Sequence, residues 1–288
     1  MKHHRLAVAV LFLVATAWGA TFTLVKNVLT RIAPEPFIFL RFTTAGLVLL
    51  AIALMTRTLP GSVLRPGIIL GMLVFSGYWC QTRGLITISP SRSAFLTGLY
   101  VVIVPFCDRL LFAKRIAARA WSGTVLAVIG TTLLVGGIDA RGGFGDLLTI
   151  GGAACFAMHV VLSARYSATM PALGLAAVQV MVVGLAAVPP SLFVPRPRMT
   201  PSVVAVILFT AIVTTAFAFV ALMWGQARVA ATEAAVILAF EPMAASITSI
   251  VFEHEPVTVG FLAGAVMILG AMALSQLPAA ERSGAIHA

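Results

Sequence analysis

Several side chains that could contact a small molecule lie within long apolar stretches of the sequence, where a polar group is unfavourable unless it faces other protein groups. Aromatic rings can stack on the apolar part of a solute, and amide, imidazole and carboxyl groups can bind its polar part. The candidate substrate-binding residues are Trp18, Tyr78, Gln81, Tyr100, Phe156, His159, Phe217, Trp224 and Glu241. Such a set would suit an amphipathic solute, such as an amino acid, held between aromatic walls.

Helical spacing places most of these candidates on shared faces near the middle of their stretches. The faces are Val74, Tyr78, Gln81 and Leu85; Ser93, Thr97 and Tyr100; Phe156, His159 and Ser163; and Thr210, Thr214, Phe217 and Trp224. The alternative is that these groups only join neighbouring helices by hydrogen bonds, typically worth about 0.6 kcal/mol each. For Trp18 and Tyr78 we favour the pocket, because a tryptophan in the middle of a membrane helix is unusual.

Charged residues inside the apolar stretches have two explanations. Glu241 is near the middle of its stretch, so it could bind a substrate ammonium or carry a proton. Its carboxyl could instead satisfy backbone groups that Pro242 leaves without partners. Arg41 and Arg83 lie within about two turns of the predicted outer ends, and we expect their long side chains to extend to the membrane interface.

Long apolar helices are the elements that must position these residues. The chain has 288 residues, 60% hydrophobic and 10% charged, whereas soluble domains average about 25% charged residues. A membrane span needs about 20 apolar residues and must be helical to satisfy its own backbone. The stretches are approximately 6–25, 36–55, 67–88, 92–113, 119–138, 145–165, 172–194, 202–225, 231–252 and 257–277. The sequence therefore predicts an all-α membrane protein of about ten transmembrane helices.

The distribution of basic residues predicts the orientation of these helices. The first stretch is too long for a cleaved signal peptide, so we expect it to be retained. With the N-terminus in the cytoplasm, ten basic residues fall inside, namely Lys2, Arg5, Arg57, Arg65, Lys114, Arg115, Arg119, Arg165, Arg228 and Arg282. Six fall outside, namely Lys26, Arg31, Arg92, Arg141, Arg196 and Arg198. An even number of spans then places both termini in the cytoplasm.

A weak internal repeat relates the two halves of the chain at an offset of about 137 residues. The segment 84–105 (GLITISPSRSAFLTGLYVVIVP) matches 221–242 (ALMWGQARVAATEAAVILAFEP) without a gap. The repeats would be residues 1–140 and 141–288, each with five helices. Because five is odd, the second repeat must be inverted, which is an architecture of alternating-access carriers. Pro105 and Pro242 occupy matching positions, so we expect them to bend their helices and act as paired hinges.

Several of these motifs, in their order and spacing, resemble the EamA-type drug/metabolite transporters. They are Trp18-Gly19, Arg41, Gly84-Leu85 before Pro105, and Glu241-Pro242. The resemblance implies ten helices in two inverted five-helix halves, and export across the inner membrane. Within that family, residues 81–105 look most like bacterial amino-acid exporters of the YddG kind. Phe156 stands where a tryptophan is more usual, so the pocket would be asymmetric.

Other classes of protein fit the sequence less well. The net charge of +10 comes from basic residues at the ends of apolar stretches, which is not a nucleic-acid-binding pattern. Cys80, Cys107 and Cys155 lie within apolar stretches and predict neither a disulfide nor a metal site. The GxGD motif at 143–146 resembles intramembrane aspartyl proteases, but the chain has no second Tyr-Asp motif. We therefore expect a non-enzymatic carrier without cofactor or metal.

Some alternatives remain open at the sequence level. The carrier could transport another small metabolite or a drug-like amine instead of amino acids. A passive channel and an integral-membrane enzyme are the two other classes. The small-residue pairs Gly67-Gly71 and Gly260-Gly264 predict close packing of helices. They do not decide between a monomer and a homodimer.

Overall fold

Prolines and hydroxyl caps fix the starts of several helices in the computed structural model. Helices α2 (Pro34–Met55), α4 (Pro90–Gly98) and α10 (Pro201–Ala211) each begin at a proline, whose fixed φ suits the first turn. Ser89 caps α4 by accepting from the Arg92 backbone N–H, and Thr200 caps α10 through the N–H of Val203. The helices therefore begin close to the prolines that separate the apolar stretches.

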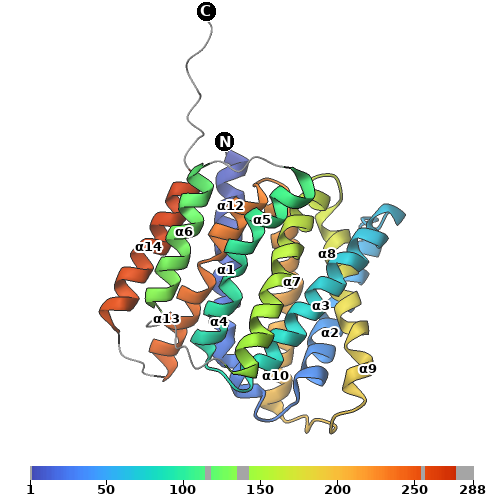
Figure 1. Cartoon of the computed structure of the whole chain (residues 1–288). Helices are drawn as coiled ribbons and strands as arrows, with labels where there is room; N and C mark the ends of the chain where they lie inside the picture. The colour runs from blue at the N-terminus through green and yellow to red at the C-terminus, as the bar shows by residue number, and fades with distance from the viewer. Residues whose placement is uncertain (1, 114–117, 135–142, 254–256, 277–288) are drawn as a thin grey trace, which may run out of the picture.

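The structure describes residues 2–113, 118–134, 143–253 and 257–276. These residues form a bundle of helices and contain no β-strand (Figure 1). The remaining helices are α1 (Lys2–Val28), α3 (Leu64–Leu85), α5 (Tyr100–Phe112), α6 (Ala118–Leu134), α7 (Phe144–Ser167), α8 (Ala172–Ala186), α9 (Val188–Ser191), α11 (Ala218–Gln226), α12 (Ala231–Leu238), α13 (Glu241–Glu253) and α14 (Val259–Gln276), with short helices η1 (Gly61–Val63) and η2 (Ile212–Phe217). Four basic residues that contribute to the predicted orientation lie outside the described residues: Lys114, Arg115, Arg141 and Arg282. The predicted boundary between the two repeats, at residues 140 and 141, also lies outside them.

The described residues include eight helical segments long and apolar enough to cross a membrane. Two further apolar helices, within α6 and α14, are shorter. A multi-pass α-helical architecture is therefore confirmed. The count of ten spans remains a prediction, since eight meet the length criterion.

Three of the stretches expected to be continuous helices are interrupted. One breaks at Leu99, between α4 and α5, and another breaks between α12 and α13. The third widens into a π-helix, η2, between α10 and α11. Neither break coincides with the predicted hinge prolines: α5 continues through Pro105, and Pro242 is the second residue of α13. The hinge role of both prolines stays a prediction.

Glycines let helices from the two halves of the chain approach closely. A side chain added at Gly19 of α1 would collide with the backbone carbonyl of Glu241 in α13. A Cβ at Gly71 of α3 would lie 2.6 Å from Val182 of α8, and one at Gly130 of α6 would lie 2.9 Å from the Gly264 carbonyl of α14. The predicted close packing of small-residue helices is confirmed. The contact at Gly19 also brings together the Trp18-Gly19 and Glu241-Pro242 motifs, which are far apart in the sequence.

Helix neighbours follow a common pattern in the two halves. Helix α3 packs against α7 and α8, and the α10–η2–α11 segment packs against α1 and α2. Helices α6 and α14 pack together at one edge of the bundle (Figure 1). Helix α1 begins at the same end of the bundle at which α14 ends, which we call the near end (top in Figure 1). The opposite end, where α1 ends and α7 begins, is the far end.

Candidate functional site

A cavity with about 470 Å³ of empty space lies where helices from both halves meet, and we call it the central cavity. Its lining includes seven of the nine residues proposed from the sequence: Trp18, Tyr78, Gln81, Tyr100, Phe156, His159 and Glu241. The structure adds Val74, Thr97, Val160, Phe219, Leu222 and Leu238 to this lining. Side chains that are up to 223 positions apart in the sequence, Trp18 and Glu241, therefore face one space.

Aromatic rings form a wall of the central cavity, and Phe42, which is buried outside the lining, connects two of them. The Tyr78 ring centroid lies 5.4 Å from that of Phe156 and 4.9 Å from that of Phe42, both edge-on. Phe219 lies 5.7 Å from Trp18 and 6.2 Å from Phe42. Edge-on and tilted contacts of this kind hold rings in fixed positions. The wall therefore offers a preformed apolar surface on which a planar or aromatic solute could stack.

Some polar groups of the cavity are already paired within the protein. Gln81 Nε2 donates to Thr97 Oγ1 at 2.9 Å, which joins α3 to α4. His159 Nε2 lies 2.7 Å from Gln179 Oε1 of α8 and 3.2 Å from the Ser163 hydroxyl. These contacts fix the orientation of the amide and imidazole that face the cavity. Gln81 and His159 therefore have both predicted roles: they line the cavity, and they also join neighbouring helices by hydrogen bonds.

Two other polar groups lack such partners. The Tyr100 hydroxyl is buried and makes no hydrogen bond with the described residues. Glu241 is 5% exposed, and its carboxylate makes no hydrogen bond or ion pair with them. Buried polar groups are normally paired, and leaving one unpaired is unfavourable. These two groups are therefore available to a molecule that enters the cavity.

A second space, the adjoining cavity, extends the central cavity towards the far end. Trp18, Tyr78, Gln81 and Glu241 line both spaces. The adjoining cavity has about 370 Å³ of empty space and is also lined by Thr21, Phe22, Val25, Arg41, Thr82 and Leu85. Because later residues of α1 and α3 line it, this space lies on the far-end side of the central cavity.

The expectation that Arg41 extends to the membrane interface is wrong. Arg41 is 4% exposed and points into the bundle, where Nε donates to Thr215 Oγ1 at 2.7 Å and Nη2 to Thr214 Oγ1 at 3.2 Å. The π-helix η2 supplies these partners, and its Thr214 carbonyl also accepts from Trp18 Nε1 at 2.8 Å. Widened turns of this kind often occur at functional sites. A local change in helix geometry thus holds both Trp18 and Arg41.

The π-helix also explains why two candidates lie outside the cavities. A π-turn contains an extra residue, which rotates the following face of the helix. Phe217 is therefore 65% exposed on the outer surface, whereas Phe219 is 1% exposed and lines the central cavity. Trp224 packs instead under the Arg228 guanidinium, 4.0 Å from the ring centroid. The predicted shared face of Thr210, Thr214, Phe217 and Trp224 is wrong beyond Thr214, because it assumed regular α spacing.

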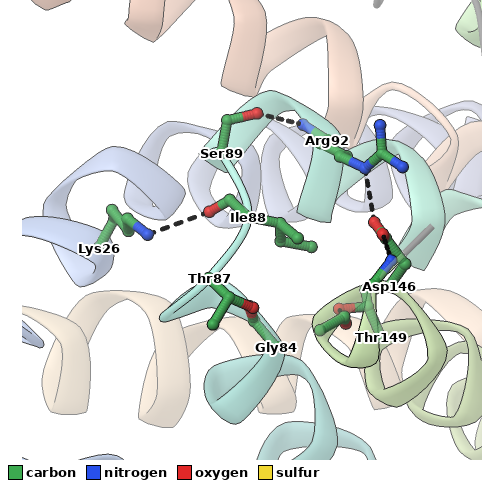
Figure 2. A network of polar contacts seen from close by, with 10 residues as sticks. Lys26, Gly84, Thr87, Ile88, Ser89, Arg92, Asp146 and Thr149 are labelled. Atoms are coloured by element: carbon green, nitrogen blue, oxygen red, sulfur yellow. Dashed lines mark hydrogen bonds and ion pairs between the residues drawn. The ribbon is translucent and has the colours of Figure 1, made fainter. Parts of the chain in front are cut away.

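Charged side chains connect the helix ends at the far end of the bundle (Figure 2). Lys26 Nζ of α1 donates to the carbonyls of Leu85, Ile86 and Ile88 at 2.6, 2.8 and 3.1 Å. Arg92 of α4 pairs with Asp146 of α7 at 2.5 Å. These contacts join α1 to the end of α3, and α4 to the start of α7.

Asp146 also explains the GxGD motif. Its Oδ2 accepts from the backbone N–H of Gly143 at 2.7 Å, so the carboxylate caps the first turn of α7. The other oxygen is paired with Arg92. A carboxylate held in this way is a helix cap and an ion-pair partner. At the same end, Arg83 pairs with Glu35 at 2.6 Å, and its side chain is 42% exposed.

No group of three or more metal-binding side chains occurs among the described residues. Within that part of the chain, the three cysteines are free thiols.

Apolar helices of membrane-spanning length and an internal cavity with aromatic and charged side chains together indicate a polytopic membrane protein. The model of the EamA-like transporter family matches residues 5–136 and again residues 143–276. The chain belongs to the EamA-like transporter family and is a membrane transporter.

Two relatives carry transporter names without an assigned substrate. An uncharacterized transporter of Archaeoglobus fulgidus is 30% identical over 270 residues, which cover 93% of this chain and 84% of that protein. The uncharacterized transporter YyaM of Bacillus subtilis is 28% identical over 204 residues, covering 64% of this chain and 66% of that protein. A crystal structure with a TM-score of 0.77 covers 93% of this chain and 96% of its own, at 20% identity, and shares the fold.

Proposed function

We propose that the protein is a secondary transporter that exports small metabolites, with amino acids including aromatic ones as its substrates, across the bacterial inner membrane. The observation that carries the proposal is the composition of the central cavity. An aromatic wall lies beside the Tyr100 hydroxyl and the Glu241 carboxylate, for which the described residues provide no hydrogen-bond partner. Aromatic surface and unpaired polar groups are what an amphipathic solute such as an amino acid requires.

Two inverted repeats of five helices, residues 1–140 and 141–288, would provide the mechanism of alternating access. Three observations support this arrangement: the family model matches the chain twice, the sequence halves align at one offset, and the helices of each half have corresponding neighbours. A cavity between such repeats can open first to one side and then to the other.

The proposed orientation places both termini in the cytoplasm. The positive-inside charge bias supports it, as does the start of α1 and the end of α14 at the same end of the bundle. The far end would then face the periplasm. A reporter that is active only in the periplasm should stay inactive when fused after His287, and its activity there would reverse the assignment.

Counterflow into liposomes that contain the purified protein tests the transport proposal. Unlabelled amino acid inside should drive saturable accumulation of labelled amino acid, measured across a panel of amino acids with and without a pH gradient. A channel would give flux without saturation or counterflow. An enzyme would convert the added compound in detergent solution. Absence of counterflow for the whole amino-acid panel would contradict the proposed substrate class.

A carrier for drug-like amines is the second candidate. One observation favours it: Glu241 lines the cavity and has no partner among the described residues, so its carboxylate would suit an ammonium group on any organic amine. Amines without a carboxylate would then show stronger counterflow than amino acids of the same size.

A further inference from the structure

Arg41 is a buried cation for which the described residues offer no negative partner. Its side chain is enclosed between α2 and η2. Its hydrogen-bond partners are the Thr215 hydroxyl, the hydroxyl and carbonyl of Thr214, and the Tyr78 hydroxyl, none of which is a carboxylate. The guanidinium carbon lies 5.2 Å from the ring centroids of both Phe42 and Tyr78. A buried charge without a counter-charge is strongly unfavourable, so its presence needs an explanation.

The guanidinium also has unused hydrogen-bond donors. An arginine carries five N–H donors in a planar fork. The bonds to η2 use Nε and Nη2, and the Tyr78 hydroxyl is one further partner of the guanidinium, so its five N–H donors are not all used by these groups. Arg41 lines the adjoining cavity, so a molecule entering from the central cavity would meet these donors. Planar carboxylates are the groups that such a fork binds best.

Glu241 supplies the opposite charge in the same space. Arg41 and Glu241 both line the adjoining cavity, and among its described lining residues no other is a lysine, arginine, aspartate or glutamate. They form no ion pair with each other, and neither is paired with another described residue. Each charge is thus left for a ligand, although direct pairing would have neutralised both.

We propose that Arg41 binds the carboxylate of the transported solute while Glu241 binds its ammonium group, so that the site selects α-amino-acid zwitterions. This inference rests on the proposed amino-acid transport and assigns its specificity. Trp18 and Tyr78 line both cavities, and they would contact the side chain of the bound amino acid. The contacts from η2 and the two flanking rings hold the guanidinium in place before the ligand arrives, which reduces the ordering cost of binding.

A purely structural Arg41 would behave differently. If its role were only to hold η2 against α2, replacing it would weaken the fold and reduce the binding of every ligand alike. A carboxylate-binding Arg41 affects only ligands that carry a carboxylate. Ligand chemistry therefore separates the two roles, independently of overall activity.

Inhibition of counterflow by four related compounds provides the test. L-Phenylalanine carries both charges, L-phenylalanine amide and phenethylamine lack the carboxylate, and 3-phenylpropionate lacks the ammonium. In the wild type, phenylalanine should inhibit about tenfold or more better than its amide, as expected for one charge-assisted hydrogen bond. In Arg41→Gln this ratio should fall towards one. In Glu241→Gln the preference for phenylalanine over 3-phenylpropionate should fall instead.

Arg31→Gln is the matched control, because Arg31 lies at the far end and lines neither cavity. It should keep the wild-type ratios. If Arg41→Gln does not fold, the wild-type ratio decides: equal inhibition by phenylalanine and its amide overturns the proposal. Retention of the tenfold ratio in a folded Arg41→Gln variant overturns it as well.

The same assay separates this inference from the proposed function. Saturable amino-acid counterflow without dependence of the carboxylate preference on Arg41 would leave amino-acid transport intact and refute the role of Arg41. Absence of amino-acid counterflow, combined with Arg41-dependent counterflow of 3-phenylpropionate, would refute the proposed substrate and retain a carboxylate site at Arg41.

Discussion

The central cavity and the far-end network are both rich in polar side chains, but only the cavity combines paired groups, such as Gln81 and His159, with groups that have no partner among the described residues. At the far end, Lys26 donates to three carbonyls, and Asp146 accepts from both Arg92 and the Gly143 backbone. In the cavity, Tyr100 and Glu241 have no partner among the described residues. A fully paired network stabilises one arrangement of helices, whereas unpaired groups retain their capacity to bind a solute.

Position along the bundle gives this difference a functional meaning. The far-end contacts join α1 to α3 and α4 to α7, the same helices that carry cavity residues nearer their middles. Alternating access requires contacts at one end to separate when the other end closes. We therefore expect substitutions in the cavity to reduce transport, and substitutions in the far-end network to change stability first.

The largest expected effect on transport follows from removing an aromatic side chain from the wall of the central cavity. Trp18→Ala or Tyr78→Ala should reduce the counterflow rate by about tenfold or more, equivalent to about 1.4 kcal/mol, because aromatic contact with the solute is lost. Rates per reconstituted protein in liposomes measure the effect. Phe217→Ala and Trp224→Ala are matched controls, since both aromatic residues lie outside the two cavities. Wild-type transport by the Trp18→Ala/Tyr78→Ala double variant would refute the cavity as the binding site.

A smaller effect, mainly on stability, is expected at the far end. Asp146→Asn removes the charge from a group that both caps α7 and pairs with Arg92, so the free energy of unfolding should fall by about 1–2 kcal/mol. Thermal unfolding in detergent should show a lower midpoint. Arg92→Gln should cause part of the same loss.

Pairing can be checked with the double variant. Asp146→Asn combined with Arg92→Gln should destabilise by less than the sum of the single changes, because both remove one interaction. Additive losses would show that the ion pair contributes nothing to stability. Asp146→Asn should retain more transport than Tyr78→Ala, and the reverse order would contradict the contrast between the two regions.

The sequence predicted the cavity better than it predicted the path of the helices that form it. Tyr78, Gln81 and His159 could be placed because they lie on regular α-helical faces, where spacing alone fixes direction. Phe217 and Phe219 could not, because a π-turn leaves no distinct pattern in an apolar stretch and shifts the face by one residue.

Arg41 was misplaced for another reason. Its distance from the end of the apolar stretch allowed an extended side chain to reach the interface. The Thr214 and Thr215 groups that hold it inside are 173 and 174 positions away. The sole hint in the sequence was that two consecutive threonines lie within an apolar stretch, where buried hydroxyls need a polar partner such as Arg41. The breaks at Leu99 and after Leu238 do have local signals, since Gly98 precedes the first and Pro242, which has no N–H for the Leu238 carbonyl, follows the second. The sequence analysis expected a bend at each proline and not an interruption of the helix before it.

The smallest effect is expected for the hinge prolines, and the structure distinguishes between them. Pro242 is the second residue of α13, one position beyond the break between α12 and α13, and its Cγ would lie 3.1 Å from a Cβ at Gly98, at the end of α4. The two interrupted helices thus meet at this proline. Pro105, by contrast, lies within α5, six residues beyond the break at Leu99.

Alanine restores a backbone N–H, so Pro242→Ala could let α12 and α13 join into one helix. Each of Pro105→Ala and Pro242→Ala should slow counterflow severalfold while the unfolding midpoint stays close to wild type, and Pro242→Ala should have the larger effect because it borders a break directly. Unchanged turnover in both variants would contradict the hinge role of the two prolines.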